Sequence, residues 1–375
     1  MQYTEYELGE LLPFEQPTAY IVKSTDYSDA YATPVLTAGK SFILGKTNET
    51  DGIFDQLPVI IFDDFTTATQ FVNFRFKVKS SAMKILHINT DLVIPKYIFY
   101  RLQIIQFDHS THKRYWIQSY SKIKVLIPSL DEQSRIVAHI EELFSELDKA
   151  VGTLKTIKEQ LEVYRQAVLK DAFSDFEKKD SIRNLTMVVT SGSRGWAKYY
   201  SNSGALFVRI GNLTHSGIDI DFRDIQHITP PDNAEGVRTR LQPNDVLVSI
   251  TADLGSIGFV SEKVEEAYIN QHIALVRFQN PVQGRFMAWY LRSEYGQKDL
   301  LKNKRGGGKL GLGLDDIRDT PVPIVSDLVA QKTVDEIEER LSVCDSIEKT
   351  VDATLAQADA MRQSILKQAF KEGSI

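Results

Sequence analysis

The chain contains a long internal repeat, and this repeat constrains the fold more than any other feature of the sequence. Residues 137–173 align without a gap with residues 334–370, at an offset of 197, and 14 of the 37 aligned pairs are identical. The identities run through both segments, from Ile140-Glu141-Glu142 and Ile337-Glu338-Glu339 to Ala172-Phe173 and Ala369-Phe370. A match of this length predicts one structural unit that occurs twice in the chain.

Each copy of the repeat has the heptad pattern of a helix that packs along a narrow seam. In the first copy, apolar residues alternate at intervals of four and three, at positions 136, 140, 143, 147, 150, 154, 157, 161, 164 and 168. The second copy keeps the seven-residue interval at Ile337, Cys344, Val351, Ala358 and Ile365. A helix of about 40 residues is roughly 60 Å long, and such a seam needs a partner. We therefore expect the two helices to form an antiparallel intramolecular coiled coil with pseudo-two-fold symmetry.

The segments outside the repeat are predicted to be mixed α/β (α+β) domains. Strands are expected at residues 58–62, 71–78, 245–250 and 273–278, and short helices at 97–106 and 285–292. The order of these elements matches in the two segments, whereas the side chains largely differ. The predicted organisation is a first domain at 1–130, a helix at 131–176, a second domain at 177–322 and a second helix at 323–375.

The net charge of −6 argues at first against a nucleic-acid partner, but the charge is unevenly distributed. The two repeat segments, 131–180 and 323–375, carry −4 each, while residues 1–130 and 181–322 carry 0 and +2. Residues 71–124 hold 10 basic groups against two acids, and residues 277–309 hold 8 against two. Such tracts are candidate DNA contacts, although charge alone is equally compatible with ordinary solvated faces. Acids on the helices suit a protein partner: Glu141, Glu142, Glu146, Glu162, Glu338, Glu339, Asp345 and Asp352.

Composition narrows the class of protein. Cys344 is the single cysteine, so no intrachain disulfide and no cysteine-based zinc site are expected. No run of about 18 apolar residues is present to span a bilayer, and the first residues do not resemble a signal peptide. We expect a soluble cytoplasmic protein without a membrane partner.

No catalytic motif stands out. The stretch Arg305-Gly-Gly-Gly-Lys309-Leu310 lacks the earlier glycine and the final Ser or Thr of a phosphate-binding loop. His109 and His112 have no nearby cysteine or carboxylate cluster that would complete a metal site. No motif for amino methylation and no hydrolase triad spacing is found. We therefore expect a binding protein, with no enzyme activity, cofactor or metal of its own.

Several strings together resemble one family. They are Gln133, Arg165-Gln166 and Leu169-x-x-Ala172-Phe173 with their second copies, Asn244–Gly255, and Asn270-Gln271-His272. Taken with the repeat and the domain order, they are similar to the specificity (S) subunits of type I restriction-modification systems. Residues 14–84 further look like the first target-recognition domain of the type IC subgroup.

The resemblance implies a subunit that reads double-stranded DNA, with two target-recognition domains that each contact one half of a bipartite, asymmetric site. The helices would act as a spacer and bind two methyltransferase (M) subunits, and nuclease-translocase (R) subunits would join them. Catalysis, S-adenosylmethionine, ATP and Mg would belong to these partners.

Basic and amide side chains on polar segments are the candidate DNA contacts. For phosphates we expect Lys77, Lys79, Lys84, Lys113 and Arg114 in the first domain, and Lys302, Lys304, Arg305 and Lys309 in the second. For bases we expect Lys40, Lys46, Asn48, Arg194, Arg209 and Asn212.

Two other classes of protein are weighed against this one. A coiled-coil adaptor that assembles other proteins, with end domains that bind peptides, would share the repeat. A single-chain methyltransferase-nuclease is disfavoured because neither catalytic motif is present.

Overall fold

The computed structural model describes residues 3–37, 41–108, 114–231, 234–302, 304–305 and 310–372. The chain divides into two compact units. Unit 1 consists of Met1–Lys155 with Asp352–Ile375, and unit 2 of Thr156–Val351. Each unit combines a mixed α/β segment with one part of each long helix, and each is described by itself.

Unit 1 contains short strands and helices followed by the start of a long helix: β1 (Thr4–Glu7), α1 (Leu8–Leu11), β2 (Phe14–Glu15), η1 (Pro17–Tyr20), β3 (Thr33–Leu36), β4 (Ile43–Thr47), β5 (Val59–Asp63), β6 (Thr69–Val72), β7 (Lys77–Val78), β8 (Met83–Leu86), α2 (Pro95–Leu102), α3 (Tyr115–Gln118), η2 (Tyr120–Lys122), β9 (Lys124–Ile127) and α4 (Leu130–Phe173). One antiparallel sheet has the order β2-β8-β5-β6. A second has the order β4-β3-β7, in which β3 and β7 are parallel. The pair β1–β9 stands at the entry to α4.

The core of unit 1 follows from the alternation of side chains along β5. Ile60 and Phe62 point to one face and pack with Tyr97 and Ile98 of α2. Val59 and Ile61 point to the other face and pack in a second cluster that includes residues of β7 and β8. This central strand is buried on both faces and is therefore apolar from Val59 to Phe62, as the sequence predicted for residues 58–62.

Unit 2 begins in α4 and has the following further elements: β10 (Lys179–Ser181), α5 (Ile182–Leu185), β11 (Thr186–Ser191), η3 (Trp196–Tyr199), β12 (Tyr200–Ser201), β13 (Ala205–Val208), η4 (Ile210–Asn212), β14 (Gln226–Ile228), α6 (Ala234–Thr239), β15 (Val246–Ser249), β16 (Ile257–Phe259), β17 (Ala267–Ile269), β18 (Ile273–Phe278), η5 (Pro281–Gln283), α7 (Gly284–Arg292), α8 (Glu294–Leu300), α9 (Leu314–Arg318), β19 (Pro321–Pro323) and α10 (Asp327–Glu372). Its main sheet has the order β11-β18-β15-β16. A second sheet has the order β12-β14-β13-β17, with β13 and β17 parallel.

The two units share one strand order. The series β2-β8-β5-β6 corresponds to β11-β18-β15-β16, and the parallel pair β3–β7 corresponds to β13–β17. The entry pair β1–β9 corresponds to β10–β19. Two segments with different side chains are thus built on one topology, as the matching order of predicted elements suggested.

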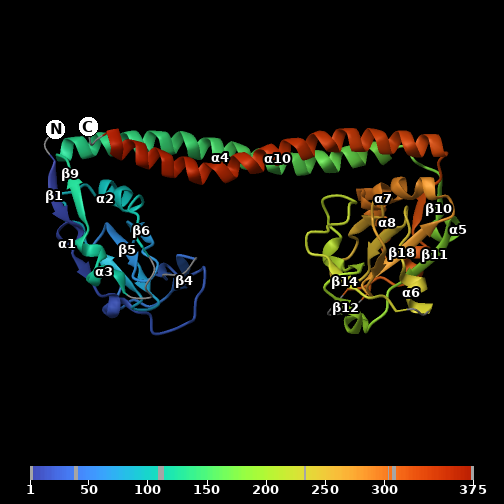
Figure 1. Ribbon diagram of the computed structural model, residues 1–375, viewed down its shortest axis with the longest axis horizontal. Helices are drawn as coiled ribbons and strands as arrows, with labels where there is room; N and C mark the ends of the chain where they lie inside the picture. Colours follow the sequence, from blue (N-terminus) through green and yellow to red (C-terminus); the bar gives the residue numbers. More distant parts are fainter. Residues whose placement is uncertain are drawn as a thin grey trace. The chain divides into compact units, whose positions relative to one another are not determined.

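The two long helices run antiparallel within each unit (Figure 1). In unit 1, Arg362 of α10 forms an ion pair with Asp148 of α4. In unit 2, Arg340 pairs with Asp171 at 2.9 Å, and Arg165 pairs with Asp345 at 2.6 Å. The residue numbers of the α4 partners increase as those of the α10 partners decrease, so the two helices are antiparallel.

The heptad prediction is wrong at two positions of the first copy, Ala150 and Tyr164, which are both exposed. Tyr164 was expected in the seam but is 44% exposed, and the guanidinium of Arg340 lies 5.6 Å from its ring centre. The buried neighbour is Arg165, because Asp345 and Glu348 of the facing helix neutralise its charge at 2.6 and 2.9 Å. A charged side chain therefore replaces an apolar one at the interface.

Two local predictions also need correction. Residues 71–78 form the end of β6 and all of β7, in different sheets, rather than one strand. Phe76, between them, makes an isolated bridge with Phe54. The helix expected at 97–106 is α2, which starts earlier because Pro95 stands in its first turn, where a proline is favoured.

Candidate nucleic-acid interface

The parallel strands β13 and β17 of unit 2 end beside each other, and a crevice opens at this edge. Arg209 follows β13 and Asn270 follows β17, and the backbone N–H of Asn270 donates to the carbonyl of Val208 at 3.2 Å. The crevice has a volume of about 590 Å³ and is lined by Arg209, Ile210, Gly211, Asn212, Asp221, Arg223, Asp224 and Asn270. We call it the β13 crevice. Polar side chains on a loop that follows a rigid strand are well placed to bind a ligand.

Two arginines give the β13 crevice its donors. Arg209 donates through Nη2 to the carbonyl of Asp224 at 3.2 Å, while its buried Nε has no partner among the described residues. Arg223 forms an ion pair with Asp221 at 2.6 Å. The hydrogen bonds from Arg223 lower the pKa of Asp221 to about 2. Guanidinium groups here could donate to a phosphate or to the O6 and N7 edge of guanine.

Asn212 supports this loop. Its side chain accepts from the N–H of Arg209 at 2.8 Å and donates to the carbonyls of Asp221 at 2.8 Å and Asp224 at 3.1 Å. The residue is buried and both ends of its amide are used. We therefore assign Asn212 to holding the crevice, and we no longer expect it to read a base.

Unit 1 has an equivalent sheet edge, where the parallel strands β3 and β7 end, but it carries different side chains. Thr37 follows β3 and Lys79 follows β7, and the N–H of Lys79 donates to the carbonyl of Leu36 at 2.9 Å, as Asn270 does in unit 2. Lys79 is exposed. The connection after β3 covers residues 37–42, whereas the connection after β13 covers residues 209–225. Equivalent edges thus carry loops of different length and chemistry.

The other residues predicted to read bases lie outside the β13 crevice. Lys46 is half-buried in β4, opposite Pro34 of β3, and Asn48 is exposed just after this strand. Arg194 is exposed between β11 and η3. Lys40 lies outside the described residues.

Two lysines predicted to contact phosphates are buried. Lys77 forms an ion pair with Glu49 at 3.0 Å, and Lys84 forms one with Asp64 at 3.1 Å. The two lysine side chains are 2% and 0% exposed. Hydrogen bonds from Ser24 and Lys77 lower the pKa of Glu49 to about 2. Because neither ammonium reaches the surface, we remove both lysines from the expected phosphate contacts.

Exposed basic residues gather on equivalent loops of the two units. Arg114 directly precedes α3, and Lys302, Lys304 and Arg305 precede α9. Each loop is joined to the end of the central strand of its unit: Tyr115 N–H donates to the carbonyl of Asp64, and Leu312 N–H to that of Ile250, both at 3.0 Å. Lys113 and Lys309 lie outside the described residues.

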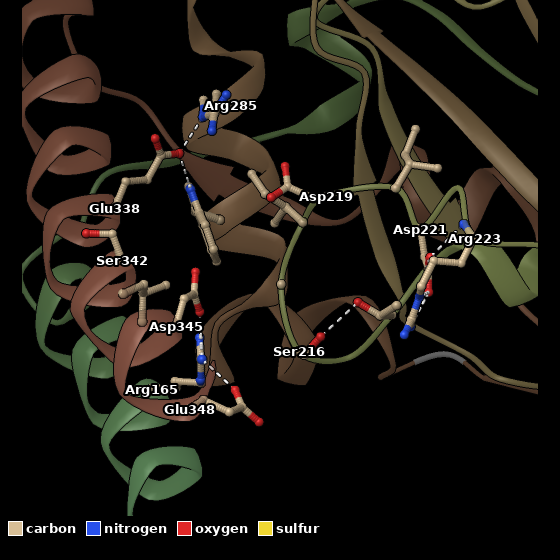
Figure 2. Close-up of a pocket in the computed structure, with 16 residues that line it drawn as sticks. Arg165, Ser216, Asp219, Asp221, Arg223, Arg285, Glu338, Ser342, Asp345 and Glu348 are labelled. Carbon is tan, nitrogen blue, oxygen red and sulfur yellow. Dashed lines mark hydrogen bonds and ion pairs between the residues drawn. The ribbon is translucent and has the colours of Figure 1, made fainter. Parts of the chain in front are cut away.

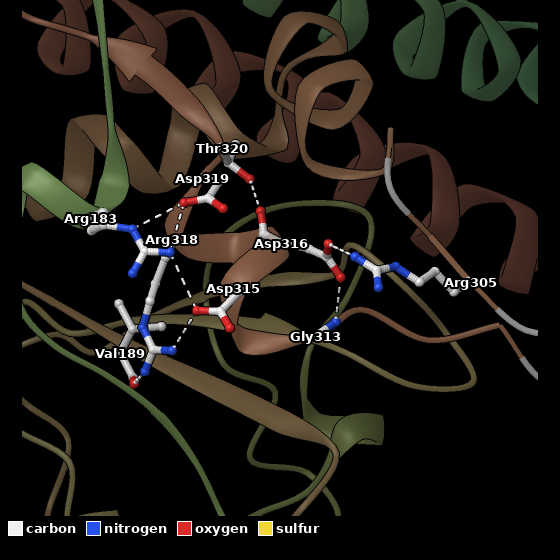
Figure 3. A network of polar contacts seen from close by, with 9 residues as sticks. All are labelled: Arg183, Val189, Arg305, Gly313, Asp315, Asp316, Arg318, Asp319 and Thr320. Atoms are coloured by element: carbon white, nitrogen blue, oxygen red, sulfur yellow. Dashed lines mark hydrogen bonds and ion pairs between the residues drawn. The ribbon is translucent and has the colours of Figure 1, made fainter.

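Arg305 is anchored at its tip (Figure 3). Its Nη2 contacts Oδ1 of the buried Asp316 at 2.8 Å, while the side chain stays 80% exposed. The other carboxylate oxygen of Asp316 accepts from the N–H of Gly313 at 2.8 Å. The guanidinium is therefore held at the surface with most of its donors open to an anion.

A serine, a histidine and an aspartate also come together in unit 2, without the geometry of a hydrolase. His215 Nε2 contacts Asp253 Oδ1 at 2.8 Å, and the same nitrogen contacts Ser256 Oγ at 3.1 Å. A catalytic histidine must bind the aspartate with one nitrogen and the serine with the other. The cluster instead joins two loops.

In the part of the chain that the structure describes, no group of three or more potential metal ligands is found. The same part has no helix long and apolar enough to cross a membrane. His109 and His112 lie outside the described residues.

The sequence alone did not place Arg223 or Asn270 in the β13 crevice. Arg223 carries no local signal, because its role depends on a loop that folds back over residues 209–212. Asn270 was noticed only as part of a string that resembles a family. The signal that could have identified these residues is a polar residue directly after each of two parallel strands. This signal can be recognised only when the order of the strands in the sheet is known.

The chain is similar in sequence to specificity subunits of type I restriction enzymes. No family model matches the chain. It is 45% identical over 174 residues, 43% of each chain, to the specificity subunit of the Escherichia coli type I restriction enzyme EcoR124I/EcoR124II. It is 28% identical over 280 residues to that of StySPI from Salmonella potsdam, covering 68% of this chain and 58% of the relative. The chain thus matches about half of the length of the curated relatives.

Solved structures show the same fold. A chain from a structure of a type I restriction-modification system, described for its complex assembly and conformational transition, has a TM-score of 0.70 at 17% identity, covering 98% of this chain and 97% of that one. The HsdS subunit from Thermoanaerobacter tengcongensis has a TM-score of 0.53 at 16% identity, covering 98% and 96%. The fold is therefore that of HsdS subunits. The homologues of this chain are specificity subunits of type I restriction enzymes.

Proposed function

We propose that the chain is the specificity subunit of a type I restriction-modification system and that each unit reads one half of a bipartite, asymmetric DNA site. One observation carries this proposal: the two units share a strand order but differ in the loops at its equivalent edges, after β3 and after β13. A scaffold that is kept while its loops vary suits two readers of different sequences. The homologues, which are specificity subunits of type I restriction enzymes, indicate that the ligand is DNA.

In this proposal the chain itself has no catalytic role and needs no cofactor. Two M subunits bind the helices α4 and α10, which form an antiparallel coiled-coil spacer, and R subunits join the complex. S-adenosylmethionine, ATP and Mg are used by these partners in the cytoplasm. The reading domains are residues 1–130 and 177–322, and the first belongs to the type IC subgroup. The 45% identity to one specificity subunit and the repeated sequence of the helices support this division.

Arg305→Ala is expected to weaken DNA binding by a similar factor for all sequences. The exposed guanidinium would lose one phosphate contact, so the slope of log K against log salt should become shallower by about 0.9. The measurement is fluorescence anisotropy of the complex with its M subunits on cognate and unrelated duplexes between low and moderate salt.

Two variants control this experiment. Arg305→Lys keeps the charge and should keep the slope. Arg135→Ala removes an equally exposed arginine from α4 and should leave both affinity and slope unchanged. A changed sequence preference in Arg305→Ala would mean that this residue reads a base. A wild-type complex whose DNA binding does not depend on salt would favour the coiled-coil adaptor instead.

A further inference from the structure

Each unit holds a similar arrangement of four charges, three of which come from the repeat. In unit 1 they are Lys96, Glu141, Asp148 and Arg362, and in unit 2 they are Arg285, Glu338, Asp345 and Arg165. The two carboxylates and the helix arginine are identical at the repeat offset of 197. The fourth member is a cation on the short helix of each domain, α2 or α7. We call each set of four a brace.

The unit 2 brace joins three helices (Figure 2). Arg285 of α7 forms an ion pair with Oε1 of Glu338 on α10, and the same oxygen accepts from Trp289 Nε1 at 2.9 Å. Two turns along α10, Asp345 receives Arg165 from α4 at 2.6 Å. The domain is thus linked to α10, and α10 to α4.

The unit 1 brace repeats these links with the helices exchanged. Lys96 of α2 pairs with Glu141 of α4, which raises the pKa of Lys96. Asp148 of α4 receives Arg362 from α10. An aromatic residue again stands one turn after the domain cation: Tyr100 packs edge to face on Phe144, with ring centres 5.6 Å apart.

These pairs contribute little to stability. Lys96 and Glu141 have side-chain exposures of 49% and 38%, and Arg285 and Glu338 of 38% and 32%. Ion pairs this exposed add little to the free energy of unfolding. The apolar contacts next to them are fully buried, at Ile140 and Ile337. The buried apolar contacts therefore hold each domain on its helices, and the charge pairs, which are directional, can fix the orientation of the domain.

The braces add an internal role to three of the helix acids expected to face a protein partner. Glu141, Glu338 and Asp345 form ion pairs inside their own unit with Lys96, Arg285 and Arg165. Because the repeat duplicates these acids, equivalent ion pairs can hold each domain in the same orientation on its own helices.

We propose that the two braces set the angle at which each reading domain is held on α4 and α10, and so make the protein selective for the spacing between half-sites. The proposal rests on the proposed function. Each unit contains part of α4 and part of α10. A domain held at a different angle on these helices would therefore contact its half-site at a different position along the DNA. One base pair more or less in the spacer displaces a half-site by about 3.4 Å and turns it by about 34°. The brace residues are positioning residues and need not touch DNA.

The test uses the complex of the chain with its M subunits and duplexes that carry the two half-sites with the natural spacer or with one base pair more or less. Wild type should prefer the natural spacer by about tenfold or more. Glu141→Ala with Glu338→Ala should bind the natural spacer almost as tightly, while the preference falls to about threefold. The bases read in each half-site should not change.

Matched variants separate orientation from loss of charge. Glu336→Ala with Asp359→Ala removes one exposed acid of α10 from each unit, neither of which belongs to a brace, and should keep the wild-type preference. The charge exchange Lys96→Glu with Glu141→Lys should restore spacer preference relative to Glu141→Ala alone. An unchanged preference in the Glu141→Ala, Glu338→Ala complex would overturn the braces as spacing devices. A wild-type complex without two-part recognition would instead refute the proposed function.

Discussion

Phe370→Ala is expected to destabilise unit 1 by about 3–5 kcal/mol and to leave unit 2 unchanged. Phe370 is the last aromatic residue of α10, and it lies in the core of unit 1 with Ile136 and Ile140 of α4. Its ring centre is 5.3 Å from that of Tyr97 in α2. Truncation would leave a cavity where α10, α4 and the domain meet. Hydrogen exchange resolved by peptide is the measurement, because it reports each unit separately.

The repeat supplies the reciprocal experiment. Phe173, at the equivalent end of α4, packs in the core of unit 2, with ring centres 5.5 Å from Phe286 and 5.4 Å from Tyr290. Phe173→Ala should therefore destabilise unit 2 by a similar amount and spare unit 1. Met361→Ala, at a half-exposed position of α10, is the control and should change little. If either phenylalanine variant destabilised both units equally, the separate cores would be contradicted.

Gln133→Ala is expected to cost about 2–4 kcal/mol of stability in unit 1. Gln133 is fully buried in the first turn of α4. It accepts from the N–H of Ile94 at 2.8 Å and donates to the carbonyls of Leu92 and Pro128, both at 3.0 Å. Alanine would leave three backbone groups without these partners, among them the buried carbonyl of Pro128. Urea unfolding followed by hydrogen exchange in unit 1 measures the loss.

A second glutamine provides the matched control. Gln331 echoes Gln133 in the sequence, but it is exposed, and its side-chain amide donates to Asp335, four residues along α10, at 2.8 Å. Gln331→Ala should thus change stability by less than about 0.5 kcal/mol. Equal effects of the two substitutions would show that the buried hydrogen bonds of Gln133 contribute nothing specific.

Much of the fold could be predicted because its signals are periodic. The heptads and the identities from Ile140 to Phe173 predicted both long helices, and apolar runs predicted β5, β15 and β18. Local patterns failed where a distant residue decides the outcome. Lys77 and Lys84 are typical surface residues by type, but Glu49 and Asp64 neutralise them in the core. Arg165 displaces Tyr164 from the helix seam for the same reason.

The candidate site was less predictable than the fold. Basic tracts indicated which segments could meet DNA, and Arg114 and Arg305 do lie on equivalent exposed loops. The β13 crevice depends on two parallel strands, β13 and β17, that are far apart in the sequence. Without that pairing, Arg209 could be proposed, but Arg223 and Asn270 could not be placed beside it.

The central claim is that each unit reads its own half of a two-part DNA site. The most direct measurement is methylome sequencing of a host that expresses the M subunit with wild type, Lys46→Ala or Arg209→Ala. Wild type should methylate one motif made of two half-sites and a spacer of fixed length. Lys46→Ala, in unit 1, should relax only one half-site, and Arg209→Ala, in unit 2, only the other. An uninterrupted motif, or a single substitution that alters bases in both halves, would contradict the account.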